Sequence, residues 1–399
     1  MSADIPQANL ERLRPLPYHE SVVAYLKNQE PEVWAWASSL SVQEQHVQDV
    51  RTQLLRETYR LSRESHGRVF TLCEAAMQRL GIEAPATLYQ GGDGPMNAML
   101  CYLPGEVHIL FSGPVLERLD DAELSALLGH ELSHYRLWSL DRGEFHVADR
   151  ILNHTLADPG AATSHAETAR LYGLYTEIYA DRGAAVVADS PLPAVSTLVK
   201  VQTGLTHIDP QSYLQQAAEV TEKGGAPSQG TSHPEAYLRA QGLLKWWDGV
   251  VEVESWLTQR IGGSAALQSL DLIAQGKLTA LTRKLIALFL QPQWMRTEPV
   301  LTQARSYFPD WRADEPALDV KELVPTELGD SVLDYMGCVL LDFALVDSDL
   351  RDEALAEALR IAAGYGGTDA LTALLKKEVG LNKRQIDKLV KAAAKPAGK

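Results

Sequence analysis

The chain has 399 residues, with 37 Lys and Arg against 52 Asp and Glu, and therefore a formal net charge of −15. This acidic balance argues against extended nucleic-acid binding, which needs a basic surface. The length favours two or three domains. The three cysteines are odd in number and far apart in sequence, so they make neither a disulfide framework nor a cysteine zinc site, as is usual in a reducing compartment.

The N-terminal part is expected to be helical, because apolar residues recur at helical spacing over residues 42–61 and 70–80. Three short strands are then predicted at Thr87–Gln90, Asn97–Leu103 and Val107–Phe111, separated by turns rich in Gly and Pro. Long helical patterns resume beyond them. The sequence thus predicts a mostly α protein with a small β-sheet (α+β), in which the helices of residues 1–85 pack on the core that follows.

The most informative motif is His-Glu-Leu-Ser-His at residues 130–134. On a helix, residues four apart share a face, so His130 and His134 can bind one zinc ion. Glu131 lies one step round the helix and can reach a water molecule on that ion without binding it. This arrangement is typical of zincins, in which the glutamate is the general base for peptide hydrolysis.

The surroundings of the motif favour a packed helix over an exposed helix with two solvated histidines. Either Asp120 or Asp121 can cap its start. Buried polar groups need partners, and a metal would supply one. The apolar stripe at helical spacing consists of Leu124, Leu127, Leu128 and Leu132.

A catalytic zinc normally has three protein ligands, so a third is expected on another element. A second long helix is predicted over residues 168–188, where Glu177 and Asp181 are four apart and share a face. We interpret Glu177 as the third ligand and Asp181 as an acceptor that orients a histidine ligand through its distal N–H. The alternative is an acidic pair on a solvated face.

Four segments together resemble one known family. They are the His130–His134 motif, the run Glu177-Ile-Tyr-Ala-Asp-Arg-Gly-Ala, the strand segment that begins Met96-Asn-Ala, and Ser232-His-Pro-Glu-Ala-Tyr-Leu-Arg. In this order, over residues 50–245, they resemble the HtpX and CAAX-prenyl-protease type of zinc metallopeptidase, peptidase family M forty-eight, a group of gluzincins. The resemblance implies a zincin-like domain with one zinc ion per chain.

The resemblance also implies roles for further residues. Asn97 and Ala98 would lie on the sheet edge beside the cleft, where a substrate peptide could add as a strand. His233 would lie near the tetrahedral oxyanion as a catalytic residue, and Arg239 would support its segment. As an alternative, His233 and Pro234 can form a loop-to-helix junction, with the proline in the first helical turn.

The chain departs from the family in several respects. Gly129 stands where many relatives have alanine, and Tyr179 replaces a charged or small residue. Many relatives are integral membrane proteins, whereas no stretch of this chain approaches about 20 consecutive apolar residues. The first residues lack a signal-peptide pattern, so we expect a cytoplasmic protein without a transmembrane segment. His146, His154 and His165 are expected to be structural or exposed rather than metal-bound.

The C-terminal half is expected to divide into several parts. The metallopeptidase domain is expected over residues 86–300, including a Gly- and Ser-rich segment at 223–232 that is either a mobile flap or an ordinary surface loop. Acidic residues and prolines suggest a linker over 301–328. Residues 329–399 read as helix, acidic turn and helix, which resembles a TerB-like helical module. Their basic tail is either a solvated helical end that frays or a docking site for an acidic protein partner.

The sequence therefore predicts a zinc-dependent metalloendopeptidase that acts on a peptide or protein substrate, with a helical C-terminal module. The alternative is a zinc-containing scaffold or stress-response adaptor whose peptidase site is idle or covered. A third possibility is a metal-free helical interaction protein, which requires the four ordered matches to be coincidental.

Overall fold

The computed structural model describes residues 10–224, 226–312, 314–320, 323 and 328–394. It divides into two compact units, one ending at Gly263 and the other beginning at Ser264. Parts of the predicted linker (residues 313, 321, 322 and 324–327) and the end of the predicted basic tail (395–399) lie outside the described residues.

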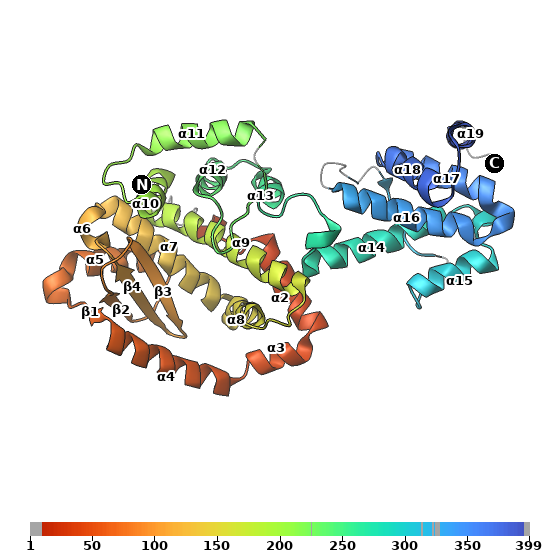
Figure 1. Ribbon diagram of the computed structural model, residues 1–399. Helices are drawn as coiled ribbons and strands as arrows, with labels where there is room; N and C mark the ends of the chain where they lie inside the picture. The colour runs from red at the N-terminus through yellow and green to blue at the C-terminus, as the bar shows by residue number, and fades with distance from the viewer. Residues whose placement is uncertain (1–9, 225, 313, 321–322, 324–327, 395–399) are drawn as a thin grey trace. The chain divides into compact units, whose positions relative to one another are not determined.

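The first unit is mostly helical and contains a four-stranded sheet (Figure 1). Its elements in chain order are α2 (Pro17–Gln29), α3 (Pro31–Ala37), α4 (Leu40–Glu57), β1 (Tyr59–Arg60), α5 (Arg63–Leu80), β2 (Ala86–Gln90), β3 (Asn97–Leu103), β4 (Glu106–Ser112), α6 (Val115–Arg118), α7 (Asp121–Ser139), η1 (Leu140–Gly143), α8 (Glu144–Leu156), α9 (Thr163–Ala188), α10 (Pro191–Thr203), α11 (Pro210–Glu222), α12 (Ala236–Trp247) and α13 (Val253–Ile261).

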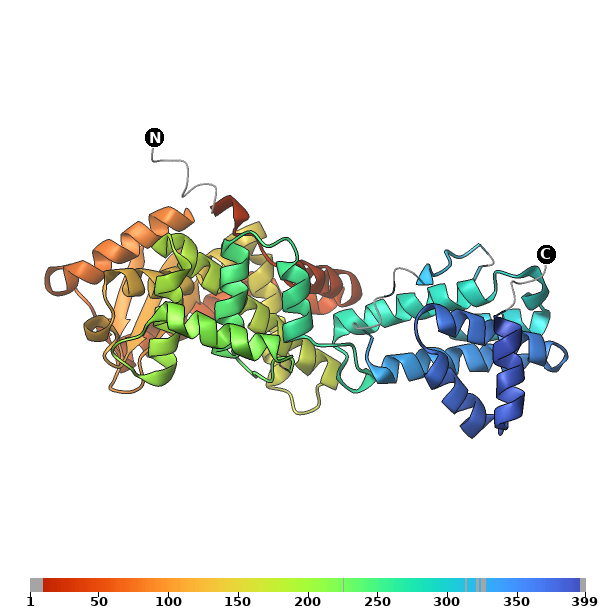
Figure 2. The same ribbon diagram turned by 90° about the horizontal axis from the view of Figure 1, so that it is seen from above.

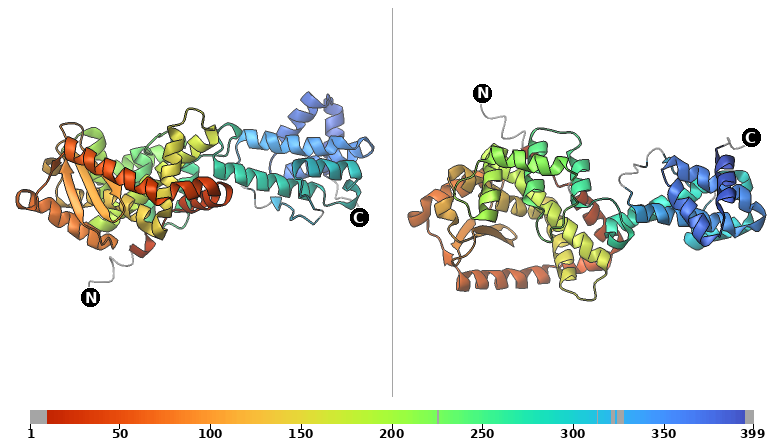
Figure 3. Two further views of the ribbon diagram at one scale, coloured as in Figure 1. Left: turned by 90° about the horizontal axis from the view of Figure 1, so that it is seen from below. Right: turned by 45° about the horizontal axis from the view of Figure 1, so that its top comes forward.

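The sheet has the strand order β1-β2-β4-β3, which places β3 at an edge. β3 pairs with β4 in antiparallel register, with Asn97 opposite Ser112, and β2 pairs with β4 in parallel. All three predicted strands are confirmed to within two residues. α5 and α7 pack together on one side of the sheet, with α7 in contact with β3 and β4. α4 runs across the other side (Figure 3).

α9 is the central helix of the first unit, and most of its side chains are buried. It packs against α7 along much of its length and also contacts α2, α8, α10 and α12 (Figure 2). The N-terminal helices surround this pair, because α2 packs on α8 and α9 while α5 packs on α7 and α9. The helix that carries the His-Glu-x-x-His motif therefore lies in the interior, as its apolar stripe predicts.

The described part of the second unit is helical. Its elements are η2 (Leu267–Ser269), α14 (Leu272–Phe289), η3 (Gln293–Met295), α15 (Glu298–Tyr307), α16 (Asp330–Val346), η6 (Ser348–Leu350), α17 (Arg351–Gly364), α18 (Thr368–Glu378) and α19 (Lys383–Ala393). The acidic turn between α16 and α17 agrees with the order of helix, acidic turn and helix that the sequence predicts. No helix among the described residues is both long and apolar enough to cross a membrane.

The boundary between the two units differs from the one expected near residues 301–328. α14 and α15 pack on α16, so residues 264–307 belong to the C-terminal unit rather than to the one that contains the motif. Leu285, Ile286 and Phe289 of α14 share one apolar core with Val339 and Phe343 of α16. The composition change near residue 309 thus lies within a unit and not between two.

Candidate metal centre

The N-terminus of α7 is fixed by its cap and by a buried ion pair. Asp120 accepts a hydrogen bond from the backbone N–H of Glu123, and the Glu123 carboxylate accepts one from the N–H of Asp120 (2.9 and 3.1 Å). Of the two candidate caps, Asp120 is the one used. Glu123 also pairs with Lys200 of α10 at 2.7 Å. These contacts set the position of α7, and hence the direction in which its histidines point.

Two glycines allow α7 and α9 to approach closely. A Cβ atom on Gly129 of α7 would lie 2.7 Å from the Cβ of Val187, and one on Gly183 of α9 would lie 2.6 Å from the Cβ of Ser133. Ordinary contacts begin near 3.4 Å. Each contact thus pairs a glycine on one helix with a larger side chain on the other. The departure from alanine at position 129 therefore has a physical reason in this chain.

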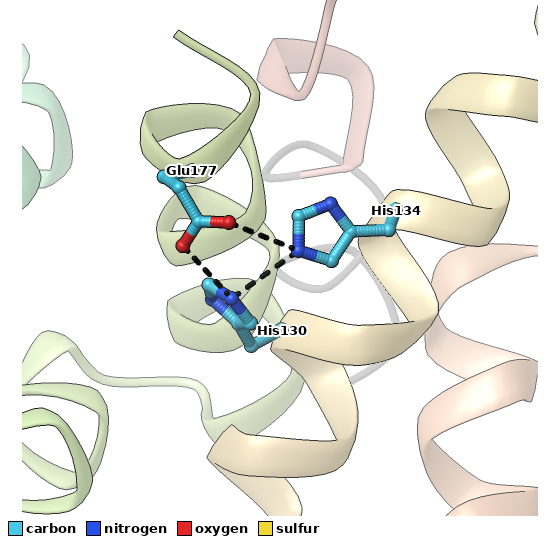
Figure 4. Close-up of side chains that lie close together, drawn as sticks. All are labelled: His130, His134 and Glu177. Atoms are coloured by element: carbon cyan, nitrogen blue, oxygen red, sulfur yellow. Dashed lines mark hydrogen bonds and ion pairs between the residues drawn. The ribbon is translucent and has the colours of Figure 1, made fainter. Parts of the chain in front are cut away.

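The close approach brings His130 and His134 of α7 to Glu177 of α9 (Figure 4). The Nε2 atoms of the two histidines are 3.3 Å apart. His130 Nε2 lies 3.4 Å from Glu177 Oε2, and His134 Nε2 lies 3.6 Å from Glu177 Oε1. Two ring nitrogens of α7 and a carboxylate of α9 thus converge on one point, although Glu177 lies 43 and 47 positions after the two histidines in the chain.

These distances suit a single small metal ion. Ligand atoms about 2.1 Å from a tetrahedral zinc ion are separated from one another by about 3.4 Å, which matches the edges of the triangle. Among the described residues, His130, His134 and Glu177 are the cluster of His, Cys, Asp and Glu side chains that can hold a metal. All three predicted ligands are therefore brought together.

Asp181 and Arg239 surround this cluster. His130 donates a hydrogen bond from Nδ1 to Asp181 Oδ1 at 3.2 Å, so Asp181 occupies the orienting position expected from the sequence. Arg239 of α12 binds both carboxylate oxygens of Asp181 (2.7 and 2.8 Å) and lies 3.2 Å from Glu177. It therefore pairs with the two buried carboxylates, whereas its support of the His233 segment stays a prediction.

The charges of the cluster perturb one another. Burial disfavours ionised Glu177, but Arg239 and His130 outweigh it and hold the pKa of that carboxyl well below its usual range. Burial likewise opposes a charged His130, yet hydrogen bonds to Asp181 and Glu177 raise its pKa to about 10. Burial lowers the pKa of His134 to about 4. In the absence of a metal, a proton on His130 partly balances the two carboxylates.

Glu131 faces the same cleft and contacts the edge strand. Its Oε2 atom accepts a hydrogen bond of 2.8 Å from the backbone N–H of Leu100 in β3. Burial raises the pKa of this carboxyl to about 7. Asn97 and Ala98 of β3 line the same cleft, whose volume is about 460 Å³. The sheet edge, Glu131 and the ligand cluster thus border one cleft.

His233 also lies at the cleft, on the loop between α11 and α12. Its side chain is 57% exposed, and its Nε2 atom is 3.5 Å from Glu177 Oε2. α12 begins at Ala236, so Pro234 precedes the helix instead of lying in its first turn. Hydrogen bonds hold the described part of this loop: Ser228 N–H donates to Arg260, and Arg170 donates to the Gly230 carbonyl. Residue 225 of the proposed flap lies outside the described residues.

The other histidines near the motif contact protein groups. His165 lies 3.0 Å from Glu30, His154 packs near Trp36, and the ring of His146 lies 4.3 Å from that of Tyr102. Sequence reasoning missed Trp138 and the carboxylate partners of Arg239. Trp138 lies one turn after His134, and the centroids of the two rings are 5.6 Å apart, a proximity that helical spacing could have indicated. No local signal pointed to the pairing of Arg239.

Comparison with known proteins supports a metal site. The chain is 28% identical over 230 residues to a protein of Arabidopsis thaliana named plastoglobule-localized metallopeptidase 48, chloroplastic. The match covers 53% of this chain and 64% of the relative, so less than two thirds of the relative's length is spanned. No family model and no solved structure matches the chain. The chain is thus a distant homologue of a metallopeptidase, with a His-His-Glu cluster that can hold a metal.

Proposed function

We propose that this chain is a zinc-dependent metalloendopeptidase of the gluzincin type. The observation that carries the proposal is the triangle of His130, His134 and Glu177, whose edges of 3.3–3.6 Å suit one tetrahedral ion. Three protein ligands leave a fourth position open, which is typical of catalytic zinc and not of structural zinc. The similarity to a protein named as a metallopeptidase supports the same activity.

A bound zinc ion would supply a water molecule of lowered pKa and would polarise the scissile carbonyl. Glu131 would accept the proton of that water and later pass it to the leaving amine. Asp181 would hold the ring of His130 in place through its Nδ1–H. His233 lies at the cleft mouth, where its exposed ring could donate a hydrogen bond to the oxyanion.

The substrate would bind along β3. This strand is at the edge of the sheet, and Asn97, Ala98 and Leu100 line the cleft beside the ligand cluster. An extended peptide can pair with such an edge through main-chain hydrogen bonds. When it does, the Leu100 N–H that now bonds to Glu131 becomes available to the peptide.

The test combines activity with metal content. We expect Glu131→Gln to keep zinc, measured by elemental analysis, while hydrolysis of a peptide library falls by roughly 10²- to 10⁴-fold, as for loss of a general base. His134→Ala should lose both zinc and activity. His207→Ala, which removes an exposed histidine outside the cluster, should change neither. Undiminished proteolysis by Glu131→Gln would refute the mechanism.

The second candidate is a zinc-containing scaffold or stress-response adaptor with an idle or covered site. Glu131 beside an incomplete ligand set argues against it, because structural zinc sites usually fill all four positions. Digestion of a peptide library with and without a chelator separates the two. Chelator-sensitive cleavage inside peptides supports the endopeptidase, whereas full zinc occupancy without any cleavage supports the scaffold.

Two further proposals concern location and partners. The relative's name places that protein at chloroplast plastoglobules. For this chain we propose a cytoplasmic location, which cell fractionation tests. We also propose that the TerB-like C-terminal helices bind an acidic protein partner through α19, whose basic residues are Lys383, Arg384, Lys388 and Lys391. Reversing two of these charges should abolish cross-linking to that partner in cells.

A further inference from the structure

A second cavity adjoins the metal cleft in the first unit. It has a volume of about 740 Å³, within the range of ligand-binding pockets. Five residues line both hollows, namely Met99, Leu100, Trp138, Asp149 and Asn153. A peptide that follows β3 past the ligand cluster would therefore meet this cavity next.

The walls of the cavity are largely apolar and aromatic. β3 and β4 contribute one wall, and α4, which runs across this side of the sheet (Figure 3), contributes another. Of the α4 residues 48–57, Leu54 alone is buried, so the described part of this helix spans a hollow instead of packing tightly. The large side chains that line the cavity include Trp36, Leu54, Met99, Tyr102, Leu110 and Trp138.

One face of α8 gives the cavity a polar wall. His146, Asp149 and Asn153 are spaced by three and four residues, so they lie on the same side of the helix, and all three line the cavity. Asp149 accepts a hydrogen bond of 2.9 Å from the Asn153 amide. Within the part of the chain that the structure describes, no Lys or Arg forms an ion pair with this carboxyl. The neighbouring Arg150 instead donates to the Ala37 carbonyl at 3.1 Å.

Asp149 therefore has no ion-pair partner among the described residues, although Arg150 lines the same cavity. Asp149 is half-buried in the cavity wall, and this burial raises the pKa of its carboxyl to about 7. A cation placed beside it would restore the balance of charge. The rings of Trp138 and Tyr102, whose centroids are 5.5 Å apart, border the same space and offer faces that attract cations.

We propose that the cavity is a specificity subsite for a lysine or arginine side chain of the substrate, with Asp149 as its charge partner. The proposal rests on the peptidase function proposed above. It defines the substrate class as peptides and proteins with a basic residue near the scissile bond. The aliphatic part of that side chain would lie against the aromatic wall, and its charged end would reach Asp149 and Asn153.

The first experiment is cleavage of a peptide library by the zinc-loaded full chain, with the products sequenced. We expect lysine and arginine to be enriched at one position near the scissile bond. A charge-assisted hydrogen bond predicts a preference of roughly tenfold or more over citrulline, and Asp149→Asn should reduce it to less than about twofold. Glu219→Gln changes an exposed carboxyl on α11, outside the cavity, and should leave the preference intact.

The second experiment needs no catalysis. Fluorescein-labelled pentapeptide pools with a central arginine or citrulline, and Ala, Leu or Ser elsewhere, are titrated with the wild-type chain and followed by anisotropy. Tighter binding of the arginine pool supports the subsite even if no peptide is hydrolysed, and the wild-type comparison stands if Asp149→Asn fails to fold. Equal binding of both pools, or cleavage without a basic preference, overturns it. If the arginine pool binds more tightly but cleavage is absent or is not inhibited by a chelator, the result counts against the peptidase proposal and not against the subsite.

Discussion

The close packing of α7 on α9 leads to a strong prediction for Gly183→Ala. The new Cβ would lie 1.6 Å from Ser133 Oγ and 2.6 Å from Ser133 Cβ. The hydroxyl can rotate away, but the Cβ cannot. To regain an ordinary contact of 3.4 Å or more, the two helices must separate locally by about 1 Å. Overpacking of this kind costs about 1–3 kcal/mol of unfolding free energy.

The shift also reaches the metal cluster. Glu177 is six residues from Gly183 on the same helix, about 9 Å along its axis. A functional metal site tolerates deviations of about 0.2 Å in its ligand distances, so even half of the shift would weaken binding. We expect a melting temperature roughly 3–9 °C lower. We also expect at least a tenfold loss of zinc affinity, measured by competition with a chromophoric chelator.

Two variants test the reasoning. Gly173→Ala, on the same helix but with no atom within 4 Å of its new Cβ, should be neutral or slightly stabilising. The double variant Ser133→Gly with Gly183→Ala exchanges the small and large residues across the contact. It should recover stability to within about 1 kcal/mol and restore zinc binding, since the helix propensities nearly cancel. Wild-type melting and zinc affinity in Gly183→Ala alone would refute the explanation.

Three further predictions follow from buried charges and from the unit boundary. Arg239→Gln should destabilise the metal-free chain by about 3–5 kcal/mol, because it leaves the buried carboxylates of Glu177 and Asp181 without their positive partner. Thermal melts with and without a chelator should show that zinc recovers part of this loss, and equal losses in both states would contradict the charge argument. Burial lowers the pKa of His19 to about 3 from an ordinary 6.5, so between these pH values the unfolded chain binds a proton that the folded chain does not. The contribution of His19 to the free energy of unfolding is therefore complete above pH 6.5 and is lost as the pH falls toward 3. In urea titrations, His19→Gln should reduce the pH dependence of the unfolding free energy by about 1.4 kcal/mol per pH unit over this range, and an unchanged pH dependence would exclude His19 as its origin. A fragment starting at Ser264 should unfold cooperatively when heated and followed by circular dichroism. A fragment starting at residue 301 should not, because it lacks Leu285 and Phe289 of the apolar core. Cooperative unfolding of the shorter fragment would support the boundary expected from composition.

Features local in sequence were predicted well. The spacing of His130 and His134 fixed their common face, the apolar stripe placed their helix in the interior, and Asp120 proved to be the cap. Turn residues delimited the three strands. The proximity of Glu177 and Asp181 to each other on a buried helix could be predicted, because helical spacing gives them a common face and apolar residues surround them.

Features that depend on packing between distant segments were not predictable. The pairing of Arg239 with Asp181 joins residues 58 positions apart, and neither neighbourhood reveals the other. The contact of Gly183 with Ser133 depends on how two helices cross. The acidic, proline-containing segment near residue 309 is typical of a linker, yet the helices before it bury their apolar faces against α16. Amino-acid composition indicates which segments are polar, whereas the boundary between the two units depends on which helices pack together.

The hydrogen bond between Leu100 and Glu131 has a consequence for handling this protein. β3 is an edge strand, and edge strands with free backbone groups can pair with another copy of the chain and start aggregation. The Glu131 carboxylate occupies one of these groups, the Leu100 N–H. Glu131→Gln keeps an oxygen acceptor there, whereas Glu131→Ala would leave the N–H open. Under the proposed mechanism the glutamine variant would therefore be the better inactive protein for trapping a peptide complex, because its Leu100 N–H keeps a hydrogen-bond acceptor until a ligand arrives.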